Sequence, residues 1–264
     1  MTGDRVKVLI GTPLAAELVA RVRAVDPRLD VTFRPDLLGT PRYEADHHPP
    51  AGRDATREAE FRALLAEAEI LYDFDTDTAP HLTEIAPRLR WIQTTSAGVG
   101  QAVRRFGLDR TDVIVTTSSG VHAGPLAEFV MMAILMFTKR YFFLSELKER
   151  REFERFCSAS LPGKTLAIVG PGKIGREIAR LARPFGLRLT ALGRTGRGAE
   201  ELGVDRVYDR AGLHAMLGEA DFVTLIVPHT PETEGLIGAA ELAAMKRGAV
   251  LINIARGEVV DEAA

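Results

Sequence analysis

Three glycines near the middle of the chain have the spacing of a loop that cradles phosphate groups. Gly170, Gly172 and Gly175 follow the apolar run TLAIV and open an amphipathic stretch. In such a loop the first glycine permits a tight turn, the second lets the backbone approach a pyrophosphate, and the third lets the helix pack closely on the strand. The pattern favours a dinucleotide site, which would include Lys173 and Ile174, over a purely structural turn.

The segment after the next apolar run bears on which dinucleotide would bind. NAD sites place an Asp or Glu about 20 residues beyond the glycines, where it accepts a hydrogen bond from the ribose. Here that position holds Gly193, followed by Arg194, Thr195 and Arg197. Without a carboxylate a 2′-phosphate is not repelled, and two guanidinium groups can pair with it. We therefore predict NADP, with NAD as the open alternative and a basic surface turn as the structural one.

An arginine close to the end of the sequence could hold a carboxylate. Arg256 directly follows the apolar run AVLINIA (249–255). A planar guanidinium binds a carboxylate through two parallel hydrogen bonds, and ligands collect beyond the carboxyl ends of strands in open parallel sheets. By itself the pattern leaves an ordinary surface arginine as the alternative.

The elements that must position these residues alternate along the chain. Short apolar runs separated by amphipathic stretches are typical of parallel sheets covered by helices. We expect strands at 6–11, 30–33, 70–74, 89–95, 113–117, 165–170, 187–193, 221–227 and 249–255, with a further short one near 206–209. A long helical stretch at 124–153 is either one helix or two joined near Tyr141. The predicted fold is α/β, with two doubly wound parallel-sheet domains, 1–119 and 120–264, joined by that helical stretch.

Composition excludes several classes of function. The 264 residues include 34 Lys+Arg and 36 Asp+Glu, a net charge of −2, which argues against nucleic acid or an anionic membrane as a partner. Cys157 is the only cysteine, which favours a reducing compartment. The most apolar run, 129–137, is far shorter than the ~20 residues of a membrane-spanning helix. The start of the chain has no long apolar stretch typical of a signal peptide. We expect a cytoplasmic protein.

Two adjacent histidines, His47 and His48, lie in a Pro- and Gly-rich stretch at 34–54. They have no third ligand nearby and two prolines follow them, so an exposed loop is favoured over a metal site. We predict no metal.

Several segments, in order, resemble the D-isomer-specific 2-hydroxyacid dehydrogenase family from about Ala68 to the end. They are TTSAGVG (94–100), GVHAGPLAEFV (120–130), LPGKTLAIVGPGKIG (161–175), ADFVTLIVPHTPETEGLIG (220–238) and MKRGAVLINIARGEVVDEAA (245–264). The resemblance implies a flavodoxin-like substrate domain at 1–119 and an NAD(P)-binding Rossmann domain at 120–264. It implies an oxidoreductase that transfers a hydride between NAD(P)H and a small 2-oxo or 2-hydroxy acid, such as glyoxylate or hydroxypyruvate.

The resemblance also implies roles for individual residues. The backbone of Ser96, Ala97, Gly98 and Val99 would hold the substrate carboxylate. Arg256 would be the catalytic arginine, which pairs with that carboxylate and polarises the 2-oxo group. Residues beside the nicotinamide would be Val227, Pro228, Thr233, Ile254 and Ala255. Homodimerisation through the long helical stretch is likewise implied.

One part of the family's pattern is absent from the sequence. The acid–base histidine and its glutamate lie beyond the segment in which this sequence ends. The resemblance therefore implies a C-terminal truncation that leaves the second domain incomplete and the chain alone inactive. His229 and His122 do not match that histidine, and loop or hinge positions are the simpler interpretation. The alternative function is a non-catalytic, dinucleotide-binding or sensing protein.

Overall fold

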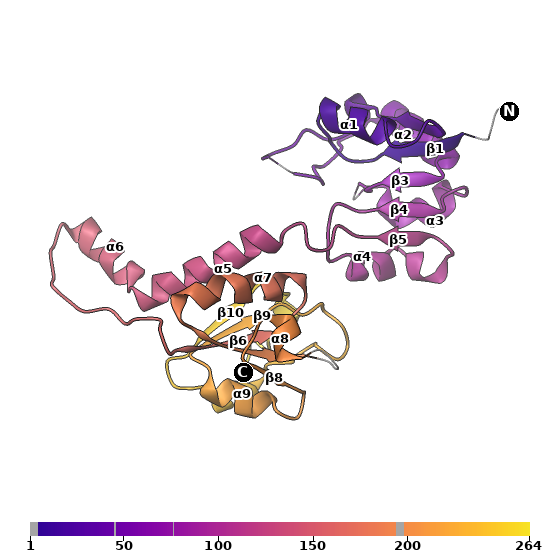
Figure 1. Cartoon of the computed structure of the whole chain (residues 1–264). Helices are drawn as coiled ribbons and strands as arrows, with labels where there is room; N and C mark the ends of the chain where they lie inside the picture. Colours follow the sequence, from indigo (N-terminus) through magenta and orange to yellow (C-terminus); the bar gives the residue numbers. More distant parts are fainter. Residues whose placement is uncertain (1–4, 45, 76, 194–197) are drawn as a thin grey trace. The chain divides into compact units, whose positions relative to one another are not determined.

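The computed structural model describes residues 5–44, 46–75, 77–193 and 198–264 (Figure 1). The chain divides into two compact units, Met1–Ser119 and Gly120–Ala264, here called the N-terminal and C-terminal units. Each contains a five-stranded sheet in which all pairs are parallel. The predicted α/β class with two parallel sheets is confirmed.

The sheet of the N-terminal unit has the strand order β2-β1-β3-β4-β5. This is the flavodoxin-like order, which reverses between β1 and β3. The strands are β1 (Val6–Ile10), β2 (Leu29–Thr32), β3 (Ile70–Tyr72), β4 (Trp91–Gln93) and β5 (Ile114–Thr116). The helices are α1 (Ala16–Arg23), α2 (Ala55–Glu67), α3 (Leu82–Ile85) and α4 (Gly100–Arg105), with 3-10 turns η1 (Pro35–Leu37), η2 (Ala79–His81) and η3 (Leu108–Arg110).

One face of this sheet forms the larger part of the unit's core. Leu9, Leu71 and Ile92 point to that face and pack with Phe61 and Leu65 of α2. The α2 helix begins where the Asp54 carboxylate accepts a hydrogen bond from the Arg57 N–H, which satisfies one of the free donors of the first turn. Helix α4 was not predicted, because its short sequence GQAVRR has no apolar periodicity.

The sheet of the C-terminal unit has the order β10-β9-β6-β7-β8. In chain order this is the Rossmann arrangement, which reverses between β6 and β9. The strands are β6 (Thr165–Val169), β7 (Arg188–Leu192), β8 (Arg206–Tyr208), β9 (Phe222–Leu225) and β10 (Val250–Asn253). The helices are α5 (Ala123–Thr138), α6 (Tyr141–Arg150), α7 (Lys173–Ala182), α8 (Ala199–Leu202), α9 (Leu213–Glu219) and α10 (Ala239–Ala244), with η4 (Arg183–Phe185) and η5 (Gly257–Val259).

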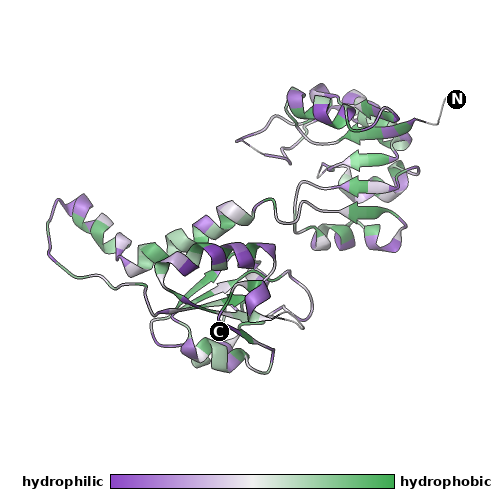
Figure 2. Ribbon diagram, viewed as in Figure 1, coloured by the Kyte–Doolittle hydropathy of each residue, from purple (hydrophilic) through white to green (hydrophobic). Residues whose placement is uncertain are grey.

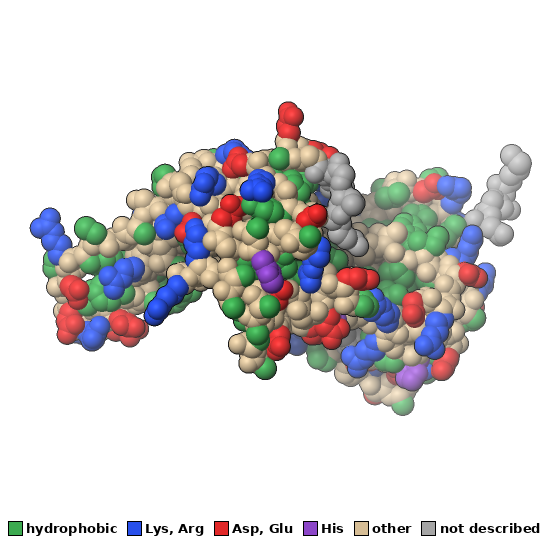
Figure 3. Space-filling view, turned by 90° about the horizontal axis from the view of Figure 1, so that it is seen from below, with side chains coloured by type: hydrophobic (Ala, Val, Ile, Leu, Met, Phe, Trp, Pro, Cys, Tyr) green, Lys and Arg blue, Asp and Glu red, His purple; other side chains and the backbone are tan. Residues whose placement is uncertain are grey.

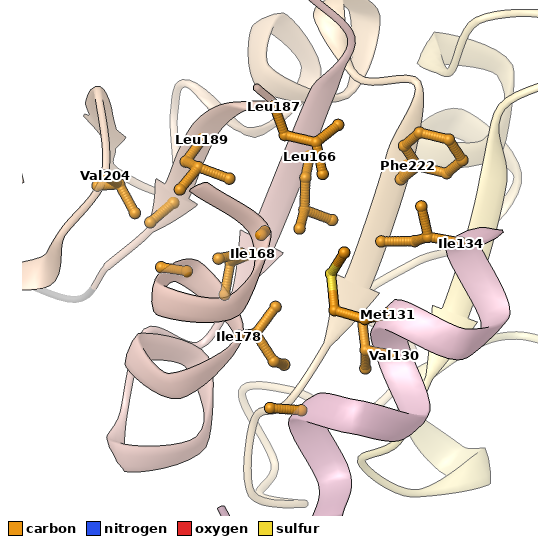
Figure 4. Close-up of a cluster of buried hydrophobic side chains, with 14 of the residues drawn as sticks. Val130, Met131, Ile134, Leu166, Ile168, Ile178, Leu187, Leu189, Val204 and Phe222 are labelled. Carbon is orange, nitrogen blue, oxygen red and sulfur yellow. The ribbon is translucent and has the colours of Figure 1, made fainter. Parts of the chain in front are cut away.

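Helices cover both faces of this second sheet, as a parallel sheet requires. Figure 4 shows Val130, Met131 and Ile134 of α5 pointing toward Leu166 and Phe222 of the sheet. Full burial of one such side chain contributes about 1.5–3 kcal/mol. A separate cluster on the opposite face includes residues of α9. Apolar residues accordingly concentrate on the strands and along α5 (Figure 2).

The long helical stretch is two helices. They are separated at Arg140, whose backbone is left-handed at φ 55°. The Arg140 guanidinium lies 4.2 Å from the ring centre of Phe143 and 5.0 Å from that of Phe156. These cation–π contacts stabilise the junction between the two helices.

Among the described residues, no helix combines the length and the apolar character needed to cross a bilayer. Basic and acidic side chains are interspersed on the face of the molecule that Figure 3 draws. This mixture agrees with the nearly balanced charge of the sequence.

Candidate functional site

The carboxyl ends of the strands in the C-terminal unit carry most of the residues that the sequence singled out. Strands β10, β9, β6 and β7 lie side by side in that order. Arg256 follows β10, Val227 and Pro228 follow β9, the glycine loop (170–175) follows β6, and Gly193 follows β7. The strand order reverses between β6 and β9, and open parallel sheets bind ligands at such a reversal.

The three glycines of this loop have three different environments. Gly170 has φ 101°, and a Cβ on it would lie 2.8 Å from the Ile226 carbonyl oxygen, so only glycine fits. A Cβ on Gly175 would lie 2.8 Å from the Gly170 oxygen, because α7 packs tightly on β6. Beside Gly172 a Cβ would meet nothing within 4 Å. The open space lies where a pyrophosphate would approach the backbone at the start of α7.

Pro171 tightens the turn between the first two glycines. The Gly172 N–H donates to the Gly170 carbonyl at 2.8 Å, which closes a three-residue turn around the proline. The proline needs no N–H for this turn, and its fixed φ suits it.

Gly193 lies beside the glycine loop at the end of β7. Its N–H donates to the Tyr208 carbonyl at 3.1 Å. A Cβ on Gly193 would lie 3.5 Å from Val207 Cγ1 and 3.8 Å from Pro171 Cγ, which is ordinary van der Waals contact. The backbone therefore has room for a side chain at this position. The predicted phosphate ligands Arg194, Thr195 and Arg197 lie outside the described residues.

The 226–238 loop beyond β9 is held by its own threonine. Thr233 Oγ1 donates to the Pro228 carbonyl at 2.6 Å and accepts from the Thr230 N–H at 2.8 Å. Val227 is half-buried beside Gly170. His229 is in the same loop with 18% of its side chain exposed, and its Nε2 lies 3.6 Å from Glu234 Oε2.

Arg256 is exposed, three residues beyond the end of β10. Its backbone carbonyl accepts from Asn253 Nδ2 at 2.8 Å, while Asn253 Oδ1 accepts from the Ala255 N–H at 2.9 Å. Through these two hydrogen bonds the Asn253 side chain stabilises the turn that carries Arg256. Sequence reasoning missed this role, although Asn is a frequent turn residue. Ile254 and Ala255 lie within this turn and are half-buried.

Backbone hydrogen bonds tie this arginine turn to the 226–238 loop. The Gly235 N–H donates to the Glu258 carbonyl at 2.8 Å, and the Ile237 N–H donates to Val259 at 3.1 Å. Both Ile237 and Val259 are fully buried. The two loops therefore form one fixed body at the edge of the sheet, with Arg256 at its exposed side.

The 94–100 loop lies in the N-terminal unit, at the carboxyl end of β4. The Ser96 carbonyl accepts from Thr94 Oγ1 at 2.9 Å and from the Ser118 N–H at 3.3 Å. Ser96 and Val99 are half-buried, whereas Ala97 and Gly98 are exposed. The loop thus presents Ala97 and Gly98 to solvent and is held through its first residues.

Beside this loop lies Asp73, which sequence reasoning also missed. Its side chain is 1% exposed and its backbone is left-handed at φ 58°. The predicted strand 70–74 ends at Tyr72 because the backbone of Asp73 leaves the extended region. Burial, followed by the nearby Asp73 carboxylate, raises the pKa of Tyr72, so this phenol stays neutral at physiological pH.

The loop predicted around His47 and His48 is present, but the expectation that it is exposed there is wrong. Both histidines are half-buried. The His47 carbonyl accepts from Thr12 Oγ1 at 2.7 Å, and His48 Nε2 lies 4.0 Å from Asp73 Oδ2. The 34–54 stretch folds against the carboxyl ends of β1 and β3, where polar groups of the sheet edge supply its partners.

A buried ion pair fastens this stretch to the unit. The Arg53 side chain is 1% exposed and contacts Glu58 at 2.8 Å and Asp75 at 3.2 Å. Burial alone would lower the pKa of Arg53, but the two carboxylates outweigh burial and raise it. Nothing in the residue types distinguished Arg53 from a surface arginine.

A hollow of about 730 Å³ lies elsewhere in the N-terminal unit. It is lined by residues such as Ile70, Trp91 and Ile114, which are the first residues of β3, β4 and β5. The hollow is therefore at the amino ends of the strands, opposite the 94–100 loop. It contains none of the residues singled out for chemistry.

Comparison with known families assigns the C-terminal half. Residues 131–264 match the family model described as D-isomer specific 2-hydroxyacid dehydrogenase, NAD binding domain. The chain is similar to a glyoxylate reductase of Thermococcus gammatolerans, at 34% identity over 190 residues, which cover 67% of this chain and 54% of that relative. The chain thus spans little more than half the length of this relative.

Solved structures agree with the fold. A D-isomer specific 2-hydroxyacid dehydrogenase family protein from Aeromonas salmonicida has a TM-score of 0.76 at 28% identity, covering 99% of this chain and 76% of its own. An NADPH-dependent glyoxylate/hydroxypyruvate reductase from Sinorhizobium meliloti, in complex with NADP and sulfate, has a TM-score of 0.74 at 26% identity. That similarity covers 98% of this chain and 75% of the other.

Proposed function

This chain belongs to the D-isomer specific 2-hydroxyacid dehydrogenase family, and we propose that it binds NADP(H) and a small 2-oxo acid for hydride transfer between them. Its C-terminal unit is the NAD-binding domain, and its N-terminal unit is the substrate domain. Glyoxylate and hydroxypyruvate are the proposed substrates, since the similar proteins from Thermococcus gammatolerans and Sinorhizobium meliloti are named for them.

The observation that carries the proposal is the order of groups along the edge of the second sheet. From β7 to β10 the edge carries Gly193, the glycine loop, the 226–238 loop and then Arg256. A dinucleotide laid along this edge would place its adenosine ribose at Gly193, its pyrophosphate at the glycine loop and its nicotinamide at the 226–238 loop. Arg256 would then meet the carboxylate of the substrate. Each residue type suits the group it would meet.

The residues of this chain would bind and orient the reactants. The nicotinamide cofactor supplies the hydride when it is bound. The glycine loop, with Lys173 and Ile174, would hold the pyrophosphate, and the Thr233-braced loop with Ile254 and Ala255 would fix the position of the nicotinamide end. Arg256 would pair with the substrate carboxylate and polarise the 2-oxo group, so that negative charge developing on that oxygen is stabilised.

The 94–100 loop would hold the substrate carboxylate through backbone N–H groups of Ser96, Ala97, Gly98 and Val99. Two of these residues, Ala97 and Gly98, are exposed. We assign no proton donor among the described histidines, because His229 faces Glu234 and His122 is exposed at the start of α5.

The preference for NADP over NAD rests on Gly193. An acidic residue at this position would accept from a ribose 2′-hydroxyl and repel a 2′-phosphate, and glycine does neither. Arg194, Thr195 and Arg197 remain the proposed phosphate ligands. The similar reductase from Sinorhizobium meliloti, which was solved with NADP, is consistent with this preference.

A homodimer in the cytoplasm is the proposed working state. Six large apolar side chains on α5 and α6 are between 44% and 53% exposed: Phe129, Met132, Phe137, Tyr141, Phe142 and Leu144. A row of this kind marks an interaction site, and a second copy of the same helices would cover it symmetrically. Light scattering should show a dimer that Met132→Glu dissociates; a wild-type monomer would refute the proposal.

The function is tested by calorimetry on the chain saturated with NADPH, with glyoxylate or hydroxypyruvate as the titrant. Wild type should bind these 2-oxo acids, and Arg256→Ala should weaken their binding by about 10- to 100-fold, since a charge-assisted bidentate contact is removed. NADPH affinity, measured by fluorescence, should stay unchanged in this variant. Tight NADPH binding by a wild type that binds neither 2-oxo acid would instead support a dinucleotide-sensing protein.

A further inference from the structure

Asp73 is placed between the sheet and the 94–100 loop. It directly follows β3, whose last residue, Tyr72, is paired in register with Gln93, the last residue of the neighbouring β4. Asp73 is therefore the first residue beyond the end of β3, and Thr95 is the second residue beyond the end of the adjacent strand β4. The Asp73 N–H donates to the Gln93 carbonyl at 2.8 Å, which fixes the backbone of the aspartate to the strand that leads into the loop.

Three hydrogen-bond donors converge on the two oxygens of the Asp73 carboxylate. Oδ1 accepts from the Phe74 N–H at 3.0 Å. Oδ2 accepts from the Thr95 N–H at 3.3 Å and from the Thr95 hydroxyl, the shortest of the three contacts. Both donors of Thr95 are thus bonded to one oxygen of a buried side chain.

The left-handed backbone is what aims this carboxylate. At φ 58° Asp73 is in a conformation that non-glycine residues rarely adopt, and such conformations persist where the surroundings fix them. Gly11, which directly follows the neighbouring strand β1, makes room for it, because a Cβ there would lie 2.7 Å from the Asp73 carbonyl oxygen. The fold therefore retains a strained residue whose side chain contacts the 94–100 loop.

We propose that Asp73 is the positioning residue of the substrate site, which holds Thr95 so that the backbone of residues 96–99 keeps its carboxylate-binding shape. This inference rests on the proposed function of the 94–100 loop. Asp73 is 1% exposed and acts through Thr95. Its loss should weaken the binding of the 2-oxo acid while leaving the dinucleotide, which the other unit binds, unaffected.

The competing explanation is that the loop needs no help from Asp73. The Ser96 carbonyl is already bonded to Thr94 and Ser118, and these contacts do not involve the carboxylate. The two explanations differ in what happens when only the carboxylate is changed.

Asp73→Asn is the sharpest variant. Asparagine tolerates the left-handed backbone, so the fold should be retained. An amide has only one oxygen, so its NH₂ group must face either the Phe74 N–H or the donors of Thr95. Asp73→Gly is the second variant, because glycine accepts the backbone without strain but leaves both Thr95 donors without the carboxylate.

Asp75→Asn is the matched control. It makes the same chemical change two residues away, at a carboxylate that is also buried but bonds Thr78 and Arg53 instead of the loop. Thr95→Val removes the hydroxyl donor from the other side, and Thr95→Ser keeps it. A positioning role predicts that Thr95→Val behaves like Asp73→Asn and that Thr95→Ser behaves like wild type.

The measurements use the full chain saturated with NADPH. Calorimetry gives the affinity for oxalate, a stable mimic of a 2-oxo acid, and hydrogen exchange gives the protection of amides 96–99. Asp73→Asn and Asp73→Gly should each weaken oxalate binding about tenfold and speed exchange of the loop. NADPH affinity should be unchanged. Where turnover is measured, KM for glyoxylate should rise while kcat changes little.

Each outcome decides one of the two proposals. Unchanged oxalate affinity or unchanged loop exchange in Asp73→Asn, with wild type binding oxalate, overturns the role of Asp73 and leaves the proposed function standing. An equal loss in Asp75→Asn would reduce the effect to general destabilisation and also overturns it. Wild type that binds NADPH but not oxalate refutes the substrate site itself, and the role of Asp73 with it.

Discussion

Replacing Gly193 by aspartate should convert the cofactor preference of this chain. The change places a carboxylate at the end of β7, where the ribose of the adenosine would lie. The structure has space for it, since a Cβ would lie no closer than 3.5 Å to Val207 Cγ1. The backbone N–H of residue 193, which bonds the Tyr208 carbonyl, is unaffected. The variant should therefore fold normally.

The size of the effect follows from two interactions. A carboxylate that accepts from the ribose hydroxyls of NADH should contribute about 1.5–3 kcal/mol. The same charge about 5 Å from a 2′-phosphate costs about 2–3 kcal/mol at an effective dielectric near 40, because the phosphate carries about −1.5 to −2. Together these effects, about 3.5–6 kcal/mol, should move the NADPH/NADH affinity ratio by roughly 10³- to 10⁴-fold toward NADH.

The assay is titration of NADH and NADPH against wild type and Gly193→Asp, followed by cofactor fluorescence. Gly193→Ala is the control, because it adds the Cβ without charge and should change neither affinity by more than about threefold, which is below 1 kcal/mol. The reasoning is refuted if wild type binds NADH as tightly as NADPH, or if the aspartate variant leaves the ratio unchanged. A drop in both affinities would show that the position touches the cofactor without discriminating at the ribose.

Three predictions concern stability. Arg53→Met should lower the unfolding free energy of the N-terminal unit by about 3–5 kcal/mol, because it leaves the Asp75 carboxylate buried without its cation. Urea unfolding, followed by the fluorescence of Trp91, the single tryptophan, measures this loss. A loss below about 1 kcal/mol contradicts the prediction. Thr224→Val should stabilise the C-terminal unit by about 1 kcal/mol, because the fully buried Thr224 hydroxyl has no hydrogen-bond partner among the described residues. Slower hydrogen exchange in β9 would show this stabilisation, and faster exchange would count against the prediction. Burial opposes ionisation of Asp221, but the Thr165 N–H and Lys246 outweigh burial and lower its pKa. The stabilisation by Asp221 is therefore present above its unfolded-state pKa near 4 and is lost as the pH falls through its lower folded-state pKa. Asp221→Asn should make the unfolding free energy of the C-terminal unit fall less steeply as the pH is lowered. An unchanged dependence on pH would exclude this cause.

Local sequence was sufficient for the features that depend on local chemistry. The alternation of apolar runs predicts two parallel sheets, because strands buried on both faces must be apolar throughout. The spacing of Gly170, Gly172 and Gly175 predicts a tight turn between strand and helix, and the structure gives a steric reason for the first and third glycines. The further short strand expected near 206–209 is present as β8 (Arg206–Tyr208).

What the sequence could not supply is contact between residues far apart in the chain. Asp73 and Thr95 are 22 residues apart, and His48 and Asp73 are 25 apart, yet the strand order β1-β3-β4 brings all three to one sheet edge. Arg53 looks like a surface residue in the sequence, and it is buried only because Asp75 and Glu58 converge on it. Residue types and spacing determined the elements and the phosphate loop, because these depend on backbone conformation and local periodicity. Tertiary structure alone decided which polar groups became partners, because burial makes a partner obligatory and only the packing of strands provides it.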